Sequence, residues 1–170
     1  MVRCADREET AEGALVAGRV SEDAACIGGM VRAMPDFSLF GDEHVRKYEA
    51  TNGQTGHEWN GAKILILRTK GRSTGELRKA PLIYGRDGDD YLVVASKGGA
   101  PEDPGWYKNL LAQPDIEIQV LGDVLPVRAR TASAEEKARL WPVMTTEWPP
   151  YDKYQSSTSR DIPLVILTKR

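Results

Sequence analysis

Residues 71–109 read GRSTGELRKAPLIYGRDGDDYLVVASKGGAPEDPGWYKN, and this stretch decides the fold class. It holds two segments rich in apolar and β-branched residues, Leu77–Gly85 and Tyr91–Ser96, which the turn-forming residues 86–89 separate. An Asp-Gly pair between two such segments is a strong signal for a β-hairpin. The stretch therefore predicts two antiparallel strands.

The second of these strands leads into Ser96-Lys97-Gly98-Gly99, which we call the corner. A strand that ends there exposes backbone N–H groups, one hydroxyl and one ammonium at a single point. The two glycines let another molecule approach the main chain because no Cβ stands in the way. Oriented amide groups and a flexible cation are suited to phosphate oxygens. The corner therefore predicts a site for an anion.

Basic side chains gather just before the corner, although the whole chain carries a net charge of −2. Between residues 63 and 79, six bases stand against the single acid Glu76, which gives this segment a local charge of +5. A solvated surface is the simpler explanation of such a run, but its position beside the corner favours a groove for a small polyanion. The overall charge gives no indication of a nucleic-acid partner. The side chains that we expect to converge on the anion are Arg72, Arg78, Lys79 and Lys97.

The size and composition are those of one ordinary soluble domain, with 170 residues of which 41% are hydrophobic and 28% are charged. The cysteines, Cys4 and Cys26, and the histidines, His44 and His57, lack the spacing of a disulfide framework or a metal site. No apolar run approaches the ~20 residues that cross a bilayer, and the first residues lack the order of a secretory signal. We therefore expect a cytoplasmic protein without a transmembrane segment.

The remaining elements follow from apolar periodicity, capping residues and turn sequences. Five or six antiparallel strands with a few short helices predict a mainly β (α+β) fold, a small β-barrel with helices at its edges. Residues 1–35 give no clear pattern and are interpreted as an N-terminal extension, and residues 36–170 as a single domain. The predicted elements outside the first hairpin are a helix over 40–52, a strand from residue 63, a helix that Asp103 caps and Pro104 opens, strands over 116–120 and 124–130, a helix capped by Ser133 and Glu136, an aromatic loop over 148–154 and a strand over 162–167.

Other chemistries find less support in the sequence. Neither a nucleophile elbow nor a Rossmann nicotinamide motif is indicated. Ser96 and Lys97 are adjacent on a predicted strand, so their side chains would point to opposite faces. Trp106 opens an i, i+4 apolar pair typical of a helix packed on the barrel, and Asn109 could present its amide to a polar heterocycle. The aromatic residues at 148–154 suit either a lid over a planar ring or a hydrophobic plug, and both interpretations stay open.

Six segments resemble, in the same order, the deazaflavin-dependent nitroreductase family. Members of this family are split β-barrel proteins that use coenzyme F420, a deazaflavin, and they include quinone reductases. The resemblance covers the chain from about Phe40 to its last residue, and it implies an FMN-binding-protein-like split β-barrel of antiparallel strands with short flanking helices. The segments that carry it are Gly71–Gly75, Arg78–Tyr84, Ala95–Gly99, Pro104–Asn109, Trp141-Pro142 and Tyr151–Gln155.

The resemblance also implies where the coenzyme and the substrate bind. Tyr151 and Tyr154 would lie near the substrate and would orient it or donate a proton to it. Many relatives carry a second base in the first motif where this chain has Ser73, which implies weaker affinity for the oligoglutamate tail of the coenzyme. The residues that would contact the coenzyme are Arg72, Ser73, Thr74, Arg78, Lys79, Ala80, Pro81, Leu82, Ile83, Val94, Ala95, Ser96, Lys97, Gly98, Gly99, Gly105, Trp106, Tyr107, Lys108, Asn109 and Tyr151.

The activity that this resemblance implies is hydride transfer from reduced coenzyme F420 to a quinone, a nitroaromatic or a similar electron-poor acceptor. Two alternatives stay open: an oxidoreductase of the same architecture that binds FMN, and a non-catalytic carrier of heme or fatty acid. The N-terminal helix that the best-studied members associate with quinone reduction at the membrane is not matched here. Membrane attachment is therefore not carried over, while peripheral contact with a membrane and the oligomeric state are left open.

Overall fold

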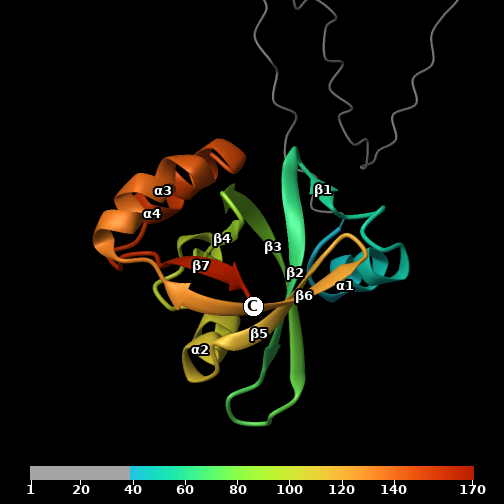
Figure 1. Cartoon of the computed structure of the whole chain (residues 1–170). Coiled ribbons are helices and arrows are strands. Elements are labelled where there is room, and N and C mark those ends of the chain that lie inside the picture. Colours follow the sequence, from blue (N-terminus) through green and yellow to red (C-terminus); the bar gives the residue numbers. More distant parts are fainter. Residues whose placement is uncertain (1–38) are drawn as a thin grey trace, which may run out of the picture. The chain divides into compact units, whose positions relative to one another are not determined.

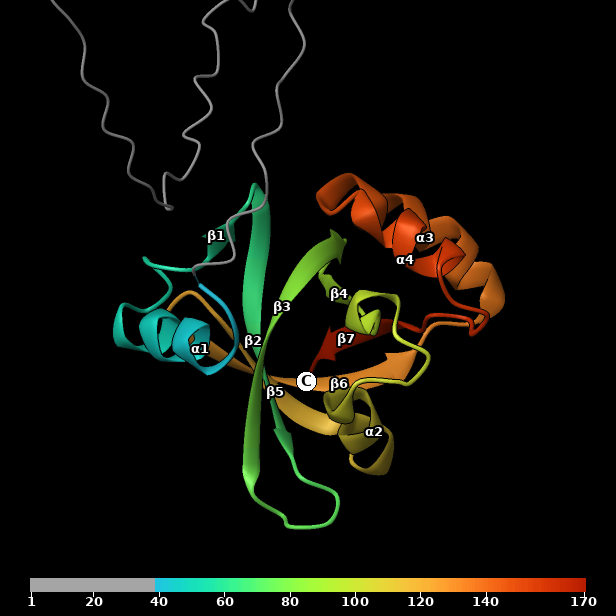
Figure 2. The ribbon, with the colours of Figure 1, turned by 180° about the vertical axis from the view of Figure 1, so that it is seen from behind.

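A computed structural model of the chain describes residues 39–170 (Figure 1, and from behind in Figure 2). The predicted N-terminal extension, residues 1–35, lies outside the described residues. The strands are β1 (Glu58–Trp59), β2 (Ala62–Lys70), β3 (Leu77–Asp87), β4 (Asp90–Val94), β5 (Asp115–Val120), β6 (Asp123–Thr131) and β7 (Leu164–Lys169). The helices are α1 (Gly41–Ala50), α2 (Gly105–Ala112), α3 (Ala134–Glu147) and α4 (Pro150–Ser156), with a 3-10 turn at Lys97–Gly99.

Six of the strands close into an antiparallel barrel. Hydrogen-bonded neighbours follow the order β2-β3-β4-β7-β6-β5, and β5 pairs back with β2, where Ile118 lies opposite Leu67. The short strand β1 adds to the free end of β2. Closure satisfies the backbone groups that an open sheet would leave at its edges. The predicted split β-barrel of antiparallel strands with flanking helices is confirmed.

The apolar run of β2 is buried on both of its faces. Leu65 and Leu67 belong to the cluster inside the barrel. Ile64 and Ile66 belong to a second cluster, which includes Tyr48 of α1. Successive side chains of a strand point to opposite faces, so a strand covered on both sides reads as continuous apolar sequence instead of an alternating one. This explains why β2 could be predicted from four apolar residues in a row.

Helices cover the barrel on opposite sides. In both views, α1 lies on one side and the pair of α3 and α4 on the other (Figures 1 and 2). Leu140 and Met144 of α3 are buried in a cluster with residues of β4 and β7, and Leu110 of α2 is part of the barrel core. The predicted capping box of α3 is confirmed, because Ser133 Oγ accepts a hydrogen bond from Glu136 N at 3.2 Å while Glu136 Oε2 accepts one from Ser133 N at 2.9 Å.

Two local predictions are wrong. Residues 148–154 do not form a loop, because α4 begins at Pro150, whose fixed φ suits the first turn of a helix. Asp103 does not cap α2, since Pro104 is the N-cap residue and Gly105 the first helical one. The Asp103 carboxylate instead binds an arginine in the segment before β7.

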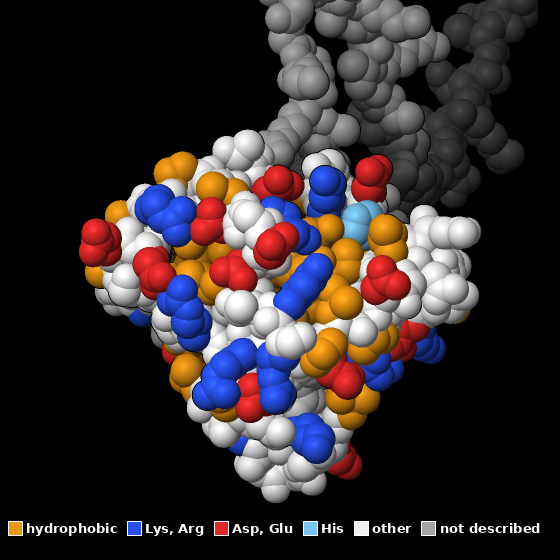
Figure 3. Space-filling view, viewed as in Figure 1, with side chains coloured by type: hydrophobic (Ala, Val, Ile, Leu, Met, Phe, Trp, Pro, Cys, Tyr) orange, Lys and Arg blue, Asp and Glu red, His pale blue; other side chains and the backbone are white. Residues whose placement is uncertain are grey.

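Charges of both signs are mixed on one face of the molecule. On the face that Figure 3 shows, acidic and basic side chains are interspersed. Such a face lacks the extended basic stripe typical of nucleic-acid binding. Within residues 39–170, no helix combines the length and the apolar character needed to span a bilayer. In the same range, no three side chains of His, Cys, Asp or Glu gather as a metal site would require.

Candidate functional site

Two neighbouring cavities lie along β3, between the β2–β3 turn and the corner. Ala80 of β3 and Trp106 of α2 line both of them, so the cavities adjoin each other. The first, which we call the polar cavity, has a volume of about 380 Å³ and is lined by the turn and the first residues of α2. The second, the apolar cavity, has a volume of about 520 Å³ and is lined by the corner, β3 and α4.

The polar cavity is built around the turn between β2 and β3. Gly71 N donates to Glu76 O at 2.8 Å, which closes the turn. Asn109 of α2 fixes it, because its Oδ1 accepts hydrogen bonds from Arg72 N at 3.2 Å and Arg72 Nη1 at 3.3 Å, and its Nδ2 donates to Thr69 Oγ1 at 3.4 Å. Both ends of the Asn109 amide are thus engaged within the protein. Asn109 thus positions the turn, while contact of its amide with a polar heterocycle stays a prediction.

Contrary to the expectation that the sequence holds no nucleophile elbow, residues 71–75 do match the pattern Gly-x-Ser-x-Gly of such an elbow, but not its structural context. In such an elbow the serine occupies a sharp turn from a strand into a helix. Ser73 occupies a turn between two antiparallel strands. Its place is that of a lining residue of the polar cavity and not that of a nucleophile.

Most of the candidate cations of the site already have a carboxylate partner. Arg72 is the exception, since its guanidinium donates to Asn109 and pairs with no carboxylate among the described residues. The pairs of Arg78 and Lys97 are exposed, and because exposed ion pairs are worth only about 0–1 kcal/mol, a bound polyanion can replace these partners; the pair of Lys79 with Glu49 is half-buried. Arg72, Arg78 and Lys79 line the polar cavity, whereas the fourth candidate cation, Lys97, lines the apolar one, and their convergence on one anion stays a prediction. The ion pairs are Arg78 with Glu76 at 2.8 Å, Lys79 with Glu49 at 2.7 Å and Lys97 with Glu102 at 3.6 Å.

The corner presents a row of backbone N–H groups. β4 ends at Val94; Ser96 has right-handed backbone angles (φ −74°, ψ −38°), and Lys97 (φ 46°) and Gly98 (φ 64°) are left-handed. The N–H groups of Ser96, Lys97 and Gly98 donate to no other described residue. Successive N–H groups in a right-handed and then left-handed conformation form a concave nest that binds anions. The anion site predicted at the corner therefore has a geometric basis.

The two glycines of the corner have different roles. A Cβ on Gly98 would meet no atom within 4 Å, so this position is open to an approaching molecule. A Cβ on Gly99 would lie 2.3 Å from Ser157 Oγ and 3.0 Å from Tyr154 O, so Gly99 is required for packing against α4. Gly98 thus allows a ligand to approach the main chain closely, whereas Gly99 allows the corner to pack against α4.

Aromatic side chains dominate the wall of the apolar cavity. The rings of Trp59 and Trp148 lie 5.6 Å apart between centroids, and α4 brings Tyr151 and Tyr154 to the same cavity. Residues 80–83 of β3 complete the lining toward the polar cavity. Flat apolar walls with a few polar groups are typical of sites that bind a planar ring. The pair of cavities is therefore suited to a ligand with a flat ring at one end and negative charge at the other.

Tyr151 is held firmly in this wall. Its side chain is 5% exposed, and burial raises the pKa of its phenol above the usual value, with a further contribution from neighbouring Tyr154. No described residue forms a hydrogen bond with the Tyr151 hydroxyl. A phenol with a raised pKa keeps its proton near neutral pH. Tyr151 can therefore donate a hydrogen bond to a ligand oxygen, but it releases the proton reluctantly.

The structure brings most of the predicted contact residues to the two cavities, while contact with the coenzyme itself stays a prediction. Ala95 and Tyr107 are buried, and Tyr107 Oη lies 2.8 Å from Thr131 Oγ1. Together with Gly99 and Lys108, they line neither cavity. The polar cavity takes Arg72, Ser73, Thr74, Arg78, Lys79, Gly105 and Asn109; the apolar cavity takes Pro81, Leu82, Ile83, Val94, Ser96, Lys97, Gly98, Tyr151 and Tyr154; and Ala80 and Trp106 line both.

Sequence reasoning missed several lining residues that precede β3. Phe40, His44 and Trp59 line the apolar cavity, and Thr69 lines the polar one. Two of these are aromatic, in a chain with only 7% aromatic residues, and this rarity is a signal that could have drawn attention to them. Their spacing does not indicate that the start of α1 and the residues of α4 border the same cavity.

Comparison with known proteins finds similar sequences along most of the chain. A family described as F420H(2)-dependent quinone reductase matches residues 41–169. An F420H(2)-dependent quinone reductase of Mycobacterium tuberculosis is 47% identical over 131 residues, which are 75% of this chain and 88% of that protein. A putative F420H(2)-dependent quinone reductase of Mycobacterium bovis is similar to the same extent, with 47% identity over 131 residues.

Solved structures of similar proteins share the fold. An F420-H2 dependent reductase, FDR-A, is 38% identical and superposes with a TM-score of 0.57 over 61% of this chain and 92% of that one. A structure described as a domain-swapped dimer is 34% identical, with a TM-score of 0.60 over 74% of this chain and 92% of that one.

Proposed function

The chain belongs to the F420H(2)-dependent quinone reductase family, an oxidoreductase family that uses coenzyme F420, and from this premise we propose that it reduces a quinone with a hydride from the reduced coenzyme. The observation that carries the proposal is the junction of an aromatic-walled cavity with a cation-lined one at Ala80 and Trp106. Coenzyme F420 has a planar deazaflavin ring, a phosphate and an oligoglutamate tail. Its flat and anionic parts correspond to the two cavities.

The residues present fit this coenzyme. The N–H groups of the nest at 96–98 would bind an oxygen of the coenzyme next to its ring. Arg72, with Arg78 and Lys79, would hold the anionic tail in the polar cavity. Gly105 leaves room there, because a Cβ at this position would meet no atom within 4 Å. When bound, the reduced coenzyme supplies two electrons as a hydride.

The protein's own groups orient the acceptor and hold a proton. Trp59, Trp148 and Tyr154 exclude water from the apolar cavity and favour a flat, apolar molecule. Complete reduction of a quinone requires one hydride and one proton. Tyr151 keeps its proton on Oη, and from there it would donate a hydrogen bond to the acceptor oxygen on which negative charge develops.

Quinones match the cavity because they combine a flat apolar ring with a carbonyl oxygen that can accept this hydrogen bond. Nitroaromatic compounds offer a flat ring and an electron-poor oxygen group, and we include them as a second class of acceptor for the same site. The three cations of the polar cavity favour a coenzyme with a polyanionic tail over FMN, which carries a single phosphate. They likewise favour a polyanion over a fatty acid.

Two measurements on the full chain test the proposal. Fluorescence titration with oxidised coenzyme F420 should show saturable binding, and absorbance of the reduced coenzyme should fall at a rate that depends on the added quinone. Preferential binding of FMN, or oxidation at a rate independent of the acceptor, would overturn the proposal. Lys153→Ala is the control variant for substitutions in the site. It should leave both measurements as in the wild type, because Lys153 is exposed on α4 and lines neither cavity.

A further inference from the structure

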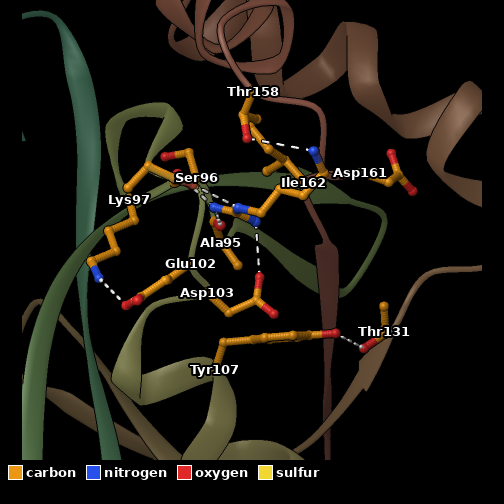
Figure 4. A network of polar contacts seen from close by, with 12 residues as sticks. Ala95, Ser96, Lys97, Glu102, Asp103, Tyr107, Thr131, Thr158, Asp161 and Ile162 are labelled. Atoms are coloured by element: carbon orange, nitrogen blue, oxygen red, sulfur yellow. Dashed lines mark hydrogen bonds and ion pairs between the residues drawn. The ribbon is translucent and has the colours of Figure 1, made fainter.

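Arg160 contacts the corner from the segment that leads from α4 to β7, and Figure 4 labels its partners Ala95, Ser96 and Asp103. Its side chain is 15% exposed, and it lines neither of the two cavities. Nε donates to Ala100 O at 2.8 Å, Nη1 to Asp103 Oδ1 at 2.8 Å, and Nη2 to Ala95 O at 3.0 Å and Ser96 O at 2.9 Å. One guanidinium thus holds both ends of the loop over residues 95–103.

These hydrogen bonds fix the direction of the nest. In a trans peptide, the carbonyl of one residue and the N–H of the next point in opposite directions. Because the carbonyls of Ala95 and Ser96 point toward Arg160, the N–H groups of Ser96 and Lys97 point away from it. Ser96 and Lys97 line the apolar cavity and Arg160 does not, so these N–H groups are presented on the side of the cavity.

The corner needs such a restraint. Lys97 is a non-glycine residue with a φ of 46°, a left-handed conformation that most side chains disfavour. Within the loop, Gly99 N donates to Ser96 O at 2.9 Å and Ala100 N to Lys97 O at 3.2 Å. These local bonds close the turn but leave its orientation on the barrel to contacts from outside, and Arg160 supplies them.

The position of Arg160 is itself fixed by two helices. Gln155 of α4 donates from Nε2 to Arg160 O at 2.8 Å, and its Oε1 accepts a hydrogen bond from Ile162 N at 2.9 Å. Lys137 of α3 donates to the same Oε1 at 3.1 Å and pairs with Asp161. The backbone on either side of Arg160 is therefore anchored to α3 and α4.

We propose that Arg160 is a positioning residue of the coenzyme site, which holds the backbone N–H groups of the corner in the arrangement that binds the coenzyme. This inference rests on the proposed function for the identity of the ligand. The geometric part, that Arg160 keeps the nest ordered, stands without it. A planar, multidentate donor is required, because an ammonium group cannot reach four acceptors spread over residues 95–103.

Arg160→Lys tests the proposal because it keeps the charge and removes the fork of donors. The first measurement is ¹⁵N relaxation of the Ser96, Lys97 and Gly98 amides in the coenzyme-free protein. The wild type should give order parameters of about 0.85, typical of rigid backbone, and the variant values below about 0.6. The amides of β2 and β7 should stay as they are in the wild type.

The second measurement is the dissociation constant of oxidised coenzyme F420. Loss of well-oriented N–H donors to a charged oxygen should raise it about tenfold in Arg160→Lys. The turnover number at saturating coenzyme should change less, which separates positioning from a loss of folded protein. Methylguanidinium added to Arg160→Ala should restore part of the affinity.

Matched variants complete the test. Arg130→Lys is the control, since Arg130 donates two 2.8 Å hydrogen bonds to Glu136 but touches no residue of the corner, and it should leave both readouts unchanged. Asp103→Asn keeps Arg160 and weakens one of its contacts, so it should shift both readouts in the same direction by less. If Arg160→Lys does not fold, Asp103→Asn alone decides whether the contacts of Arg160 order the corner.

Two results would overturn the inference. One is a variant whose corner amides are as rigid as those of the wild type. The other is a lower melting temperature with an unchanged dissociation constant, which would make Arg160 a stabilising residue only. If the wild type does not bind coenzyme F420, the proposed function fails, and the relaxation measurement alone decides whether Arg160 orders the nest.

Discussion

Tyr151 is the side chain on which the proposed reaction depends most directly. Tyr151→Phe removes one hydroxyl from a buried ring and leaves the apolar wall intact. A hydrogen bond to an oxygen that becomes negative is worth about 1.5–3 kcal/mol, so we expect the turnover number to fall by roughly 10- to 100-fold. Coenzyme affinity should change little, and steady-state kinetics with a fluorescence titration measure both.

The control for this substitution is Tyr91→Phe, which removes a hydroxyl from a buried tyrosine of the barrel core that lines neither cavity. It should leave the turnover number unchanged. Turnover of Tyr151→Phe equal to that of the wild type would remove Tyr151 from the mechanism.

Lys97 is the one candidate cation at the corner. Lys97→Ala should weaken coenzyme binding by about 1–3 kcal/mol if the ammonium meets an anionic oxygen. Glu102, 3.6 Å from Lys97 Nζ, competes with the coenzyme for this charge, so Glu102→Gln should not weaken binding. Titrations at low salt measure both variants. Equal dissociation constants for Lys97→Ala and the wild type would assign Lys97 to the surface.

Residues that line the cavities could be predicted better than the residues that hold those lining residues in place. Lys97 and Tyr151 stand in segments whose residue types and order are visible in the sequence. Arg160 gave no signal, because its role depends on four acceptors up to 65 residues away in the sequence. Asn109 was predicted at the site for another reason, and only the structure shows that it binds the turn.

At the scale of the elements, a substitution at the start of α2 should change coenzyme binding without lowering the stability of the fold. Gly105 is the first residue of α2, and its Cβ position is empty. Gly105→Ala should therefore keep or slightly raise stability, by up to about 1 kcal/mol, because alanine restricts the unfolded chain. The added methyl group enters the polar cavity and should weaken coenzyme binding. Thermal unfolding and a coenzyme titration measure the two effects.

Gly99→Ala is the opposite case and serves as the comparison. Its new Cβ would meet Ser157 and Tyr154 of the α4 region, and its φ of 83° disfavours alanine, so the melting temperature should fall. A Gly105→Ala protein that binds the coenzyme as well as the wild type would show that the tail does not pass this point.

The capping box of α3 predicts a dependence of stability on pH. Hydrogen bonds from Arg130, and then from Ser133 N, lower the pKa of Glu136 from 4.5 to about 2. A carboxylate whose pKa is lower in the folded state stabilises the protein above its ordinary pKa, and this contribution is lost as the pH falls through about 2. The melting temperature of the wild type should therefore fall more between pH 5 and pH 2 than that of Glu136→Gln. Parallel curves would contradict this assignment.

Elements with local signals could be predicted, and elements that depend on distant partners could not. The strands follow from apolar runs and Asp-Gly turns, and the capping box follows from residues three apart. Helix α4 was missed because the aromatic residues around 148–151 were interpreted as a loop, although Pro150 is a signal for the start of a helix. In the protein, Tyr151 is buried in one cluster with Leu140 and Met144 of α3, a packing that the local sequence does not reveal.

For the whole molecule, the charge around the polar cavity predicts how binding depends on salt. Raising the ionic strength should weaken binding of the coenzyme, because exposed charges are screened beyond about 8–10 Å. The dependence should be shallow despite the local charge of +5 at residues 63–79, since two of the three cations that line the polar cavity, Arg78 and Lys79, already have carboxylate partners. Titrations over a salt series measure the slope. An affinity independent of salt would exclude a role for these cations in holding the tail.

The hairpins predicted a barrel, but which two strands pair to close it could not be predicted. Each hairpin has a local turn signal, whereas the pairing of β5 with β2 joins residues about 50 positions apart and has none. The same holds for the two cavities. Their lining comes from segments that the sequence separates, and only the closed barrel brings α1, β3, the corner and α4 together.

The most direct test of the two-cavity site is a crystal structure of the full chain with oxidised coenzyme F420. We predict the deazaflavin ring against residues 80–83 and the corner, with the tail in the polar cavity beside Arg72. A coenzyme bound elsewhere on the barrel, or with its tail directed away from the polar cavity, would contradict this account.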